Sequence, residues 1–256
     1  MDCGLTDRII IITGAAAGIG AAIARLALAE GAGGLLLVDR DATGGARMAA
    51  ELGDKTRFFR ADLVEAGAPA AIAAAALDAF GRIDGLVNAA ALTSRGSFVD
   101  GSVEVWDRMF DTNARAGFFL MQAAIADMRR RAAAGSIVNI LSMNAYVGIP
   151  ELAIYSGSKG AMATLTRNAA HAHMADRIRV NGINLGWVAT PGERRMQAVE
   201  LGRGDGWLAA AEALQPLGRL VTAEEAARLA VFLLGDVSVP MSGSVVDFEQ
   251  KVAGAI

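Results

Sequence analysis

Seven short apolar runs alternate with helix-like stretches along the chain, and this alternation limits the possible folds more than any other feature. The runs are nearly continuous in Ile, Leu and Val, which is typical of parallel strands covered on both faces. We expect strands at 8–13, 34–39, 56–62, 83–88, 136–142, 178–184 and 243–247, and helices near 18–31, 42–52, 66–80, 102–131, 155–174 and 222–235. The order predicts an α/β fold, a doubly wound, mainly parallel seven-stranded sheet with helices on both faces.

Length and composition favour a single domain. The chain has 256 residues, of which 54% are hydrophobic, and it contains no repeat or linker, so we expect one domain over residues 1–256. No apolar run reaches the roughly 18 residues of a membrane span, and the N-terminus lacks a signal-peptide pattern. The single cysteine, Cys3, excludes an internal disulfide, and a net charge of −3 gives no reason to expect nucleic acid. We therefore expect a cytoplasmic protein that binds neither membrane nor nucleic acid.

A glycine-rich turn follows the first expected strand. The residues Thr13 to Gly20 read T-G-A-A-A-G-I-G and lead directly into an Ala- and Ile-rich helix. Glycines at such a turn let the backbone approach a pyrophosphate, and the helix N-terminus offers N–H groups to the anion. The context favours nucleotide binding, although glycines also serve plain structural turns.

An acidic residue ends the second expected strand, nineteen positions after Gly20. A carboxylate at that interval, here Asp39, accepts hydrogen bonds from the adenosine ribose hydroxyls and repels a 2′-phosphate. Asp39 therefore favours NAD. Arg40 keeps NADP possible, because a neighbouring arginine accommodates the phosphate.

A tyrosine and a lysine in the fifth helical segment predict the chemistry. Tyr155 and Lys159 lie four positions apart, so their side chains share one helix face, and Ser142 ends a buried strand. A phenol, with a pKa of about 10, is a poor base at neutral pH, but an ammonium within about 4–6 Å lowers that pKa. We predict a site that moves a proton on or off an oxygen at the carboxyl ends of the strands. The alternative is an ordinary amphipathic helix whose Tyr and Lys reach solvent.

These residues resemble the short-chain dehydrogenase/reductase family, and the likeness covers nearly the whole chain. It rests on the T-G-x-x-x-G-I-G turn, the Asp62-Leu63 pair, Asn88, the segment Val188-Ala189-Thr190, and Asn113, Ser142, Tyr155 and Lys159 at the family's spacing. Three places depart from the family pattern. The N-N-A-G motif becomes Asn88-Ala89-Ala90-Ala91, Leu185 replaces a proline, and the terminal V-D-G-G becomes Val246-Asp247-Phe248-Glu249.

The resemblance implies hydride exchange between a nicotinamide cofactor and an alcohol or carbonyl. It implies that Tyr155 is the general acid/base, that Lys159 lowers its pKa and holds the nicotinamide ribose, and that Ser142 binds the substrate oxygen. Asn113 would position a water that relays protons through Lys159. The implied cofactor residues are Gly14, Gly18, Ile19, Gly20, Asp39, Arg40, Asp62, Leu63, Asn88, Tyr155, Lys159, Val188 and Thr190.

The segment 191–216 is rich in glycine and charge, as a mobile substrate lid would be. The pocket candidates are polar, which suits a sugar or polyol: Thr93, Ser94, Arg95, Ser142, Asn144, Glu151, Glu193, Arg194 and Arg195. We expect an NAD-dependent sugar or polyol dehydrogenase. The alternatives are an NADPH-dependent 3-oxoacyl or other carbonyl reductase and, less favoured, a non-catalytic nucleotide-binding protein.

The helix after Lys159 is apolar over more than one stripe, so it lies deep or meets another subunit. The family resemblance favours subunit contact through this helix and the one near 102–131, and we expect a homotetramer. His171 and His173 lie two positions apart and cannot share a helix face, so we expect no metal site.

Overall fold

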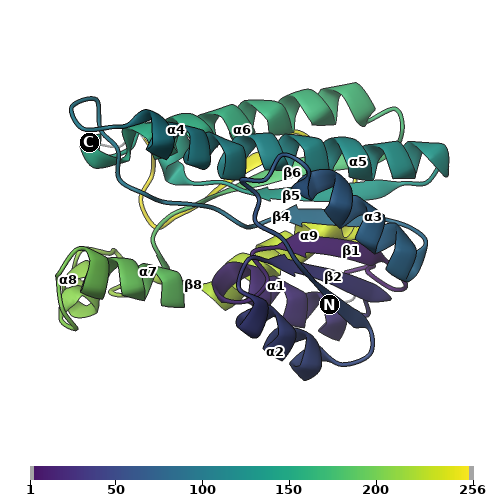
Figure 1. The fold of residues 1–256 in the computed structure, drawn as a ribbon, viewed down its shortest axis with the longest axis horizontal. Helices are drawn as coiled ribbons and strands as arrows, with labels where there is room; N and C mark the ends of the chain where they lie inside the picture. The colour runs from purple at the N-terminus through teal and green to yellow at the C-terminus, as the bar shows by residue number, and fades with distance from the viewer. Residues whose placement is uncertain (1–2, 254–256) are drawn as a thin grey trace.

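A computed structural model describes residues 3–253 and has one seven-stranded parallel sheet with helices on both faces (Figure 1). The strand order is β3-β2-β1-β4-β5-β6-β9, which confirms the predicted doubly wound fold. The strands are β1 (Ile9–Thr13), β2 (Gly34–Asp39), β3 (Thr56–Arg60), β4 (Gly85–Asn88), β5 (Gly135–Ile140), β6 (Ile178–Leu185) and β9 (Val245–Phe248). The order reverses between β1 and β4, and this reversal opens a crevice at their carboxyl ends.

Two helical layers enclose the sheet (Figure 1). One layer holds α1 (Gly18–Ala29), α2 (Ala42–Leu52) and α9 (Ala223–Leu234); the other holds α3 (Ala68–Phe80), α4 (Val103–Phe110), α5 (Ala116–Arg130) and α6 (Ala153–His173). Side chains of a strand alternate between faces, so Ile10 packs against the first layer and Ile11 against the second. Burial on both sides is why β1 is apolar at four successive positions.

The single helix expected at 102–131 is interrupted. Asp111–Arg115 form a π-helical turn between α4 and α5, in which the Ala116 N–H donates to the Asp111 carbonyl five residues back. The extra residue turns Thr112, Asn113 and Ala114 inward together, and all three are buried. Such turns often occur at functional sites.

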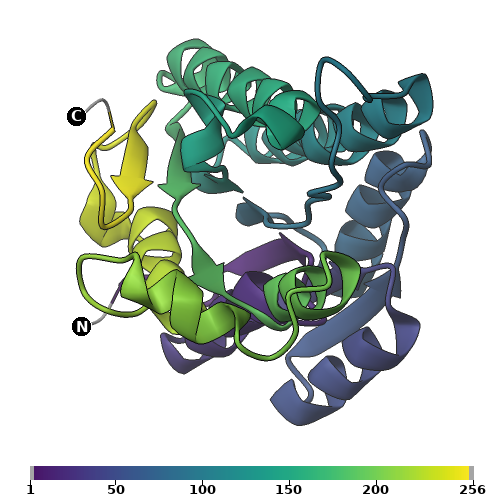
Figure 2. The same cartoon turned by 90° about the vertical axis from the view of Figure 1, so that its left-hand side faces the viewer.

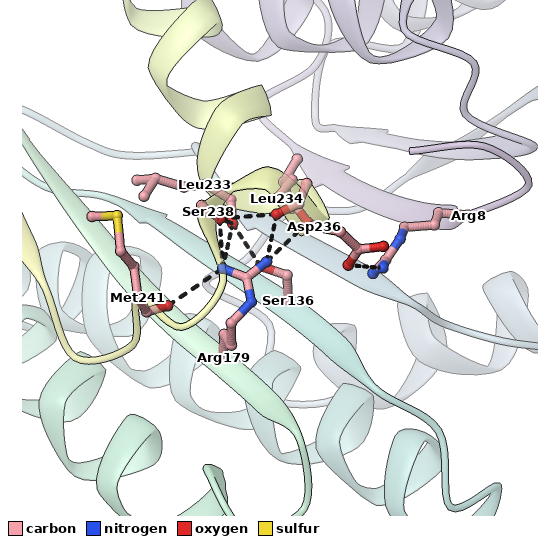
Figure 3. Close-up of polar contacts among 9 residues, drawn as sticks. Arg8, Ser136, Arg179, Leu233, Leu234, Asp236, Ser238 and Met241 are labelled. Carbon is pink, nitrogen blue, oxygen red and sulfur yellow. Dashed lines mark hydrogen bonds and ion pairs between the residues drawn. The ribbon is translucent and has the colours of Figure 1, made fainter. Parts of the chain in front are cut away.

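A buried arginine, Arg179, lies at the amino end of β6 (Figure 3). The Arg179 guanidinium donates to the Gly235 carbonyl at 2.8 Å and to Ser238 Oγ at 2.7 Å, and thereby caps the carboxyl end of α9. Beside it, Arg8 and Asp236 form an ion pair. Structural hydrogen bonds therefore occupy this end of the sheet, and the crevice lies at the other. Among residues 3–253, no helix is long and apolar enough to cross a membrane.

Candidate active site

A cleft lies at the carboxyl ends of β1, β2 and β4, with about 690 Å³ of empty volume, open solvent included. Five predicted cofactor residues line it, so the glycine turn, the end of β2 and the segment after β3 surround one space: Gly14, Asp39, Arg40, Asp62 and Leu63. A largely preformed cleft of this size at a switch in strand order is typical of a nucleotide site.

The glycine turn has the geometry that a pyrophosphate requires. Gly14 and Gly18 have φ values of 68° and 56° in the left-handed region, and a Cβ on Gly20 would lie 2.3 Å from the Gly14 carbonyl oxygen. Ala17 precedes α1 and provides no side-chain cap, so the first N–H groups of α1 are left for an anion. Ile19 packs on the core and holds this helix end in place.

The ribose end of the cleft is held by two backbone hydrogen bonds. Asp39 Oδ2 accepts from the Ala16 N–H at 3.0 Å, and Oδ1 accepts from the Asp41 N–H at 3.0 Å. These bonds fix the carboxylate beside the glycine turn, where it fits a ribose with two free hydroxyls. Arg40 is exposed and lines the same cleft.

Backbone groups keep the altered N-N-A-G segment in place. Thr13 Oγ1 accepts hydrogen bonds from the N–H groups of Ala89 and Ala90 at 3.0 and 3.1 Å. Asn88 donates to Asn139 Oδ1 at 2.8 Å inside the sheet. Because Thr13 binds the backbone N–H groups of Ala89 and Ala90, these two hydrogen bonds do not depend on the side chains there. The alanines therefore leave the anchoring of this segment intact.

The four predicted catalytic residues lie together at the carboxyl end of β5. Lys159 Nζ donates to the carbonyl of Ile140, the last residue of β5, at 2.8 Å and lies 5.8 Å from the centre of the Tyr155 ring. Ser142 comes two residues later and hydrogen-bonds the phenol. Asn113 donates to Ser158 Oγ at 3.0 Å, and Ser158 lies between Tyr155 and Lys159 in the sequence of α6.

Burial controls the ionisation of the catalytic pair. It raises the pKa of Tyr155 to about 12; the hydrogen bond from Ser142 lowers this pKa, and the carboxylate of Glu193 raises it. Burial lowers the pKa of Lys159 to about 8. The expectation that Lys159 brings the phenol's pKa below its ordinary value is therefore wrong for the protein chain alone, because desolvation dominates.

The segment 191–216 forms α7 (Pro191–Arg195), a π-helical turn (Met196–Glu200) and α8 (Trp207–Ala213). Figure 2, which faces this edge of the molecule, shows it in green opposite the teal helices, with the yellow C-terminal segment alongside. Two short strands, β7 (Val188–Ala189) and β8 (Val221–Thr222), join its ends. Thr190 caps α7 by accepting from the Glu193 N–H at 3.1 Å.

The predicted substrate residues have different surroundings. Glu193 Oε1 accepts hydrogen bonds from Trp187 and Gln197, whereas Arg194 and Glu151 are exposed. Asn144 follows Ser142 and donates its N–H to Ser142 Oγ at 3.1 Å. Thr93, Ser94 and Arg195 are also exposed, and Arg95 Nε is buried without a hydrogen-bond partner among residues 3–253.

The altered C-terminal motif and Gln250 connect the sheet edge to residues on either side of segment 191–216, namely Gly186 and Leu217. The Gly186 N–H donates to the Phe248 carbonyl at 3.1 Å, and a Cβ on Gly186 would lie 1.9 Å from Glu249 Oε2. Gln250 accepts from the Leu217 N–H at 2.8 Å. The Glu249 side chain therefore fills the space next to Gly186, the residue that precedes Trp187.

Sequence reasoning missed several residues of this site: Thr13, Asn139, Ser158, Trp187, Gln197 and Gln250. A polar residue inside an apolar strand, as at Asn139, was the one local signal available. Thr13, Ser158 and Gln250 act through contacts with residues distant in sequence, whereas Trp187 and Gln197 bond to Glu193, six and four positions away.

Comparison with known proteins agrees with this geometry. A protein-family model described as enoyl-(acyl carrier protein) reductase matches residues 14–249. The chain is 36% identical over 243 residues to 2-(S)-hydroxypropyl-CoM dehydrogenase 3 of Xanthobacter autotrophicus, covering 94% of each chain. It is 34% identical to D-threitol dehydrogenase of Mycolicibacterium smegmatis over 246 residues, 95% of this chain and 92% of that protein. The structure of L-sorbose reductase from Gluconobacter frateurii, complexed with NADPH and L-sorbose, superposes with a TM-score of 0.93 at 28% identity and covers 100% of both chains. The chain therefore belongs to the short-chain dehydrogenase/reductase family of nicotinamide-dependent oxidoreductases.

Proposed function

We propose that this protein is an NAD-dependent dehydrogenase that oxidises a secondary alcohol group of a sugar or polyol. The observation that carries the proposal is the grouping of Ser142, Tyr155 and Lys159 at the end of β5, beside a cleft that contains Asp39. The carboxylate of Asp39 supports NAD over NADP. Similarity to a D-threitol dehydrogenase and to an L-sorbose reductase supports a polyhydroxylated substrate.

In the proposed mechanism, a bound nicotinamide cofactor would supply the hydride acceptor, and the protein's own residues position the substrate and move its proton. Ser142 binds the substrate oxygen and aligns the carbinol. Tyr155 removes the hydroxyl proton as general base. Lys159 stabilises the phenolate that this requires and would hold the nicotinamide ribose, and Val188 and Thr190 would border the carboxamide.

A small cavity supports the proposed proton relay. It measures about 10 Å³, room for one water molecule, and Asn113, Thr112 and Lys159 are among its lining residues. Thr112 Oγ1 is buried without a hydrogen-bond partner among residues 3–253, so it offers such a water a further contact. We propose that Asn113 helps to hold a water in this cavity, and that this water relays the proton from Tyr155 through Lys159 to solvent.

The test is Tyr155→Phe, which removes one oxygen from a buried side chain. We expect turnover to fall on the order of 10²–10⁴-fold, the usual contribution of general acid–base catalysis, while NAD binding remains. Wild-type turnover is followed with sugars, polyols and 3-hydroxyacyl thioesters, first with NAD⁺ and then with NADP⁺. Preference for the thioester and NADP would support the 3-oxoacyl reductase alternative, and a Tyr155→Phe variant with full turnover would refute the assignment of the base.

We also propose that residues 191–216 close over the substrate and that the protein is a homotetramer in the cytoplasm. Phe118 and Phe119 on α5 and Trp106 on α4 are large exposed apolar side chains, which supports a subunit interface there. The single cysteine fits a reducing compartment. A particle of one 26.4 kDa chain in light scattering would refute the oligomer.

A further inference from the structure

The Glu193 side chain is held in one orientation by two donors. Its Oε1 accepts from Trp187 Nε1 at 2.7 Å and from Gln197 Nε2 at 2.6 Å. Gln197 is 5% exposed, and its own Oε1 accepts from Arg203 Nη1 at 2.8 Å. This chain of hydrogen bonds fixes the carboxylate, as a recognition group requires.

Glu193 is near both the glycine turn and the phenol of Tyr155. The Glu193 N–H bonds to Thr190 Oγ1, and the Thr190 side chain lies 3.5 Å from the position a Cβ would take on Gly18. On the other side, Glu193 is close enough to raise the pKa of Tyr155. The reacting part of a substrate has to occupy this region.

One oxygen of this carboxylate is unused. Both protein donors bond to Oε1, and within the described range 3–253 no donor bonds to Oε2 and no cation pairs with Glu193. A carboxylate only accepts hydrogen bonds, so a substrate hydroxyl can donate to Oε2, whereas a substrate carboxylate would be repelled.

We propose that Glu193 recognises a second hydroxyl group of the substrate, next to the carbinol that reacts. The inference rests on the proposed function and narrows it to substrates with neighbouring hydroxyls. Glu193 then determines specificity, and Tyr155 remains the base.

The test compares butane-2,3-diol with butan-2-ol, which differ by one neighbouring hydroxyl, under NAD⁺ reduction. We expect the wild type to prefer the diol. Glu193→Gln should lower kcat/KM for the diol about tenfold, the difference between a charged and a neutral hydrogen bond, and should change butan-2-ol less than about threefold. Glu200→Gln is the matched control, because Glu200 is an exposed acid of the same segment that pairs with Arg195 at 3.5 Å.

A second readout separates recognition from a structural role. Glu193→Gln removes a negative charge near Tyr155, so the pH at which kcat/KM reaches half its plateau should fall for both alcohols, with an unchanged unfolding temperature. An unchanged diol-to-monoalcohol ratio in Glu193→Gln would overturn the inference and leave the proposed function intact. If the wild type oxidised neither these alcohols nor any polyol, the proposed function itself would fail, and the inference with it.

Discussion

Replacing Lys159 with Met tests how the site obtains a base near neutral pH. Lys159 is 3% exposed, and its Nζ lies 5.8 Å from the centre of the Tyr155 ring. A methionine fills similar space but carries no charge. The substitution therefore removes the cation that would oppose the effect of burial on the phenol.

The magnitude follows from this distance and from the two pKa values. With a pKa of about 12, roughly one phenol in 10⁴ is ionised at pH 8, a deficit of about 5 kcal/mol at 1.36 kcal/mol per unit. If the phenolate charge is placed at the ring centre, 5.8 Å from Nζ, the two unit charges attract with about 3 kcal/mol at an effective dielectric constant near 20, equivalent to about two pKa units. A protonated Lys159 therefore offsets about half of the deficit, and its pKa of about 8 means that this charge is largely present only below pH 8. The positive charge of a bound oxidised cofactor would be available for the rest.

We expect Lys159→Met to lower kcat about 100-fold at pH 7, where Lys159 is mostly charged, and by progressively less as the pH rises above the Lys159 pKa of about 8. The assay is kcat at saturating NAD⁺ from pH 7 to pH 10, with fluorescence titration of cofactor binding at each pH. Lys55→Met is the control, because the Lys55 Nζ donates to the Ala32 carbonyl at 3.5 Å and lies outside the predicted site. A uniform loss across the whole pH range would refute the reasoning, because it would mean that Lys159 acts only through binding the ribose.

Two further predictions concern the cofactor and the fold. Asp39→Ser removes the repulsion of a 2′-phosphate next to Arg40. The ratio of kcat/KM for NAD⁺ to that for NADP⁺ should therefore fall on the order of 10–100-fold. An unchanged ratio would mean that Asp39 does not select between the two cofactors. Arg179→Met leaves the Gly235 carbonyl and Ser238 Oγ without their buried donor and should lower the free energy of unfolding in urea by about 3 kcal/mol. The exposed control Arg228→Met should lower it by less than about 0.5 kcal/mol, and equal losses in the two variants would contradict this account.

The sequence predicted the framework because its signals are local. Successive apolar residues such as Ile9 to Ile12 indicate a strand that is buried on both faces. The position of Gly14 to Gly20 between a strand and a helix indicates a glycine-rich turn. The four-residue spacing of Tyr155 and Lys159 depends only on helix geometry. Each of these features is complete within one element, so it can be read before any packing is known.

Contacts between distant segments explain what sequence reasoning missed. The space above Gly186 is filled by Glu249, 63 positions later, and Arg179 caps a helix that ends more than fifty residues away. The direction of the Tyr155 pKa shift also depends on burial by the whole fold, which a spacing of four residues does not reveal. The π-helical turn at Asn113 adds one residue to a turn, a change too small to alter the apolar pattern of 102–131.

Two charged groups act on Tyr155 in opposite directions, and they belong to different parts of the fold. Lys159 is bonded to the end of β5 and lies in the core, so its effect is fixed by the sheet. Glu193 belongs to the segment that we propose closes over substrate, and it raises the phenol's pKa. A substrate hydroxyl that donates to Glu193 would offset part of that negative charge and so lower the pKa of Tyr155. Under the inference drawn above, a substrate with neighbouring hydroxyls therefore both fits the site and strengthens its base, whereas a monoalcohol leaves the phenol in its more weakly acidic state.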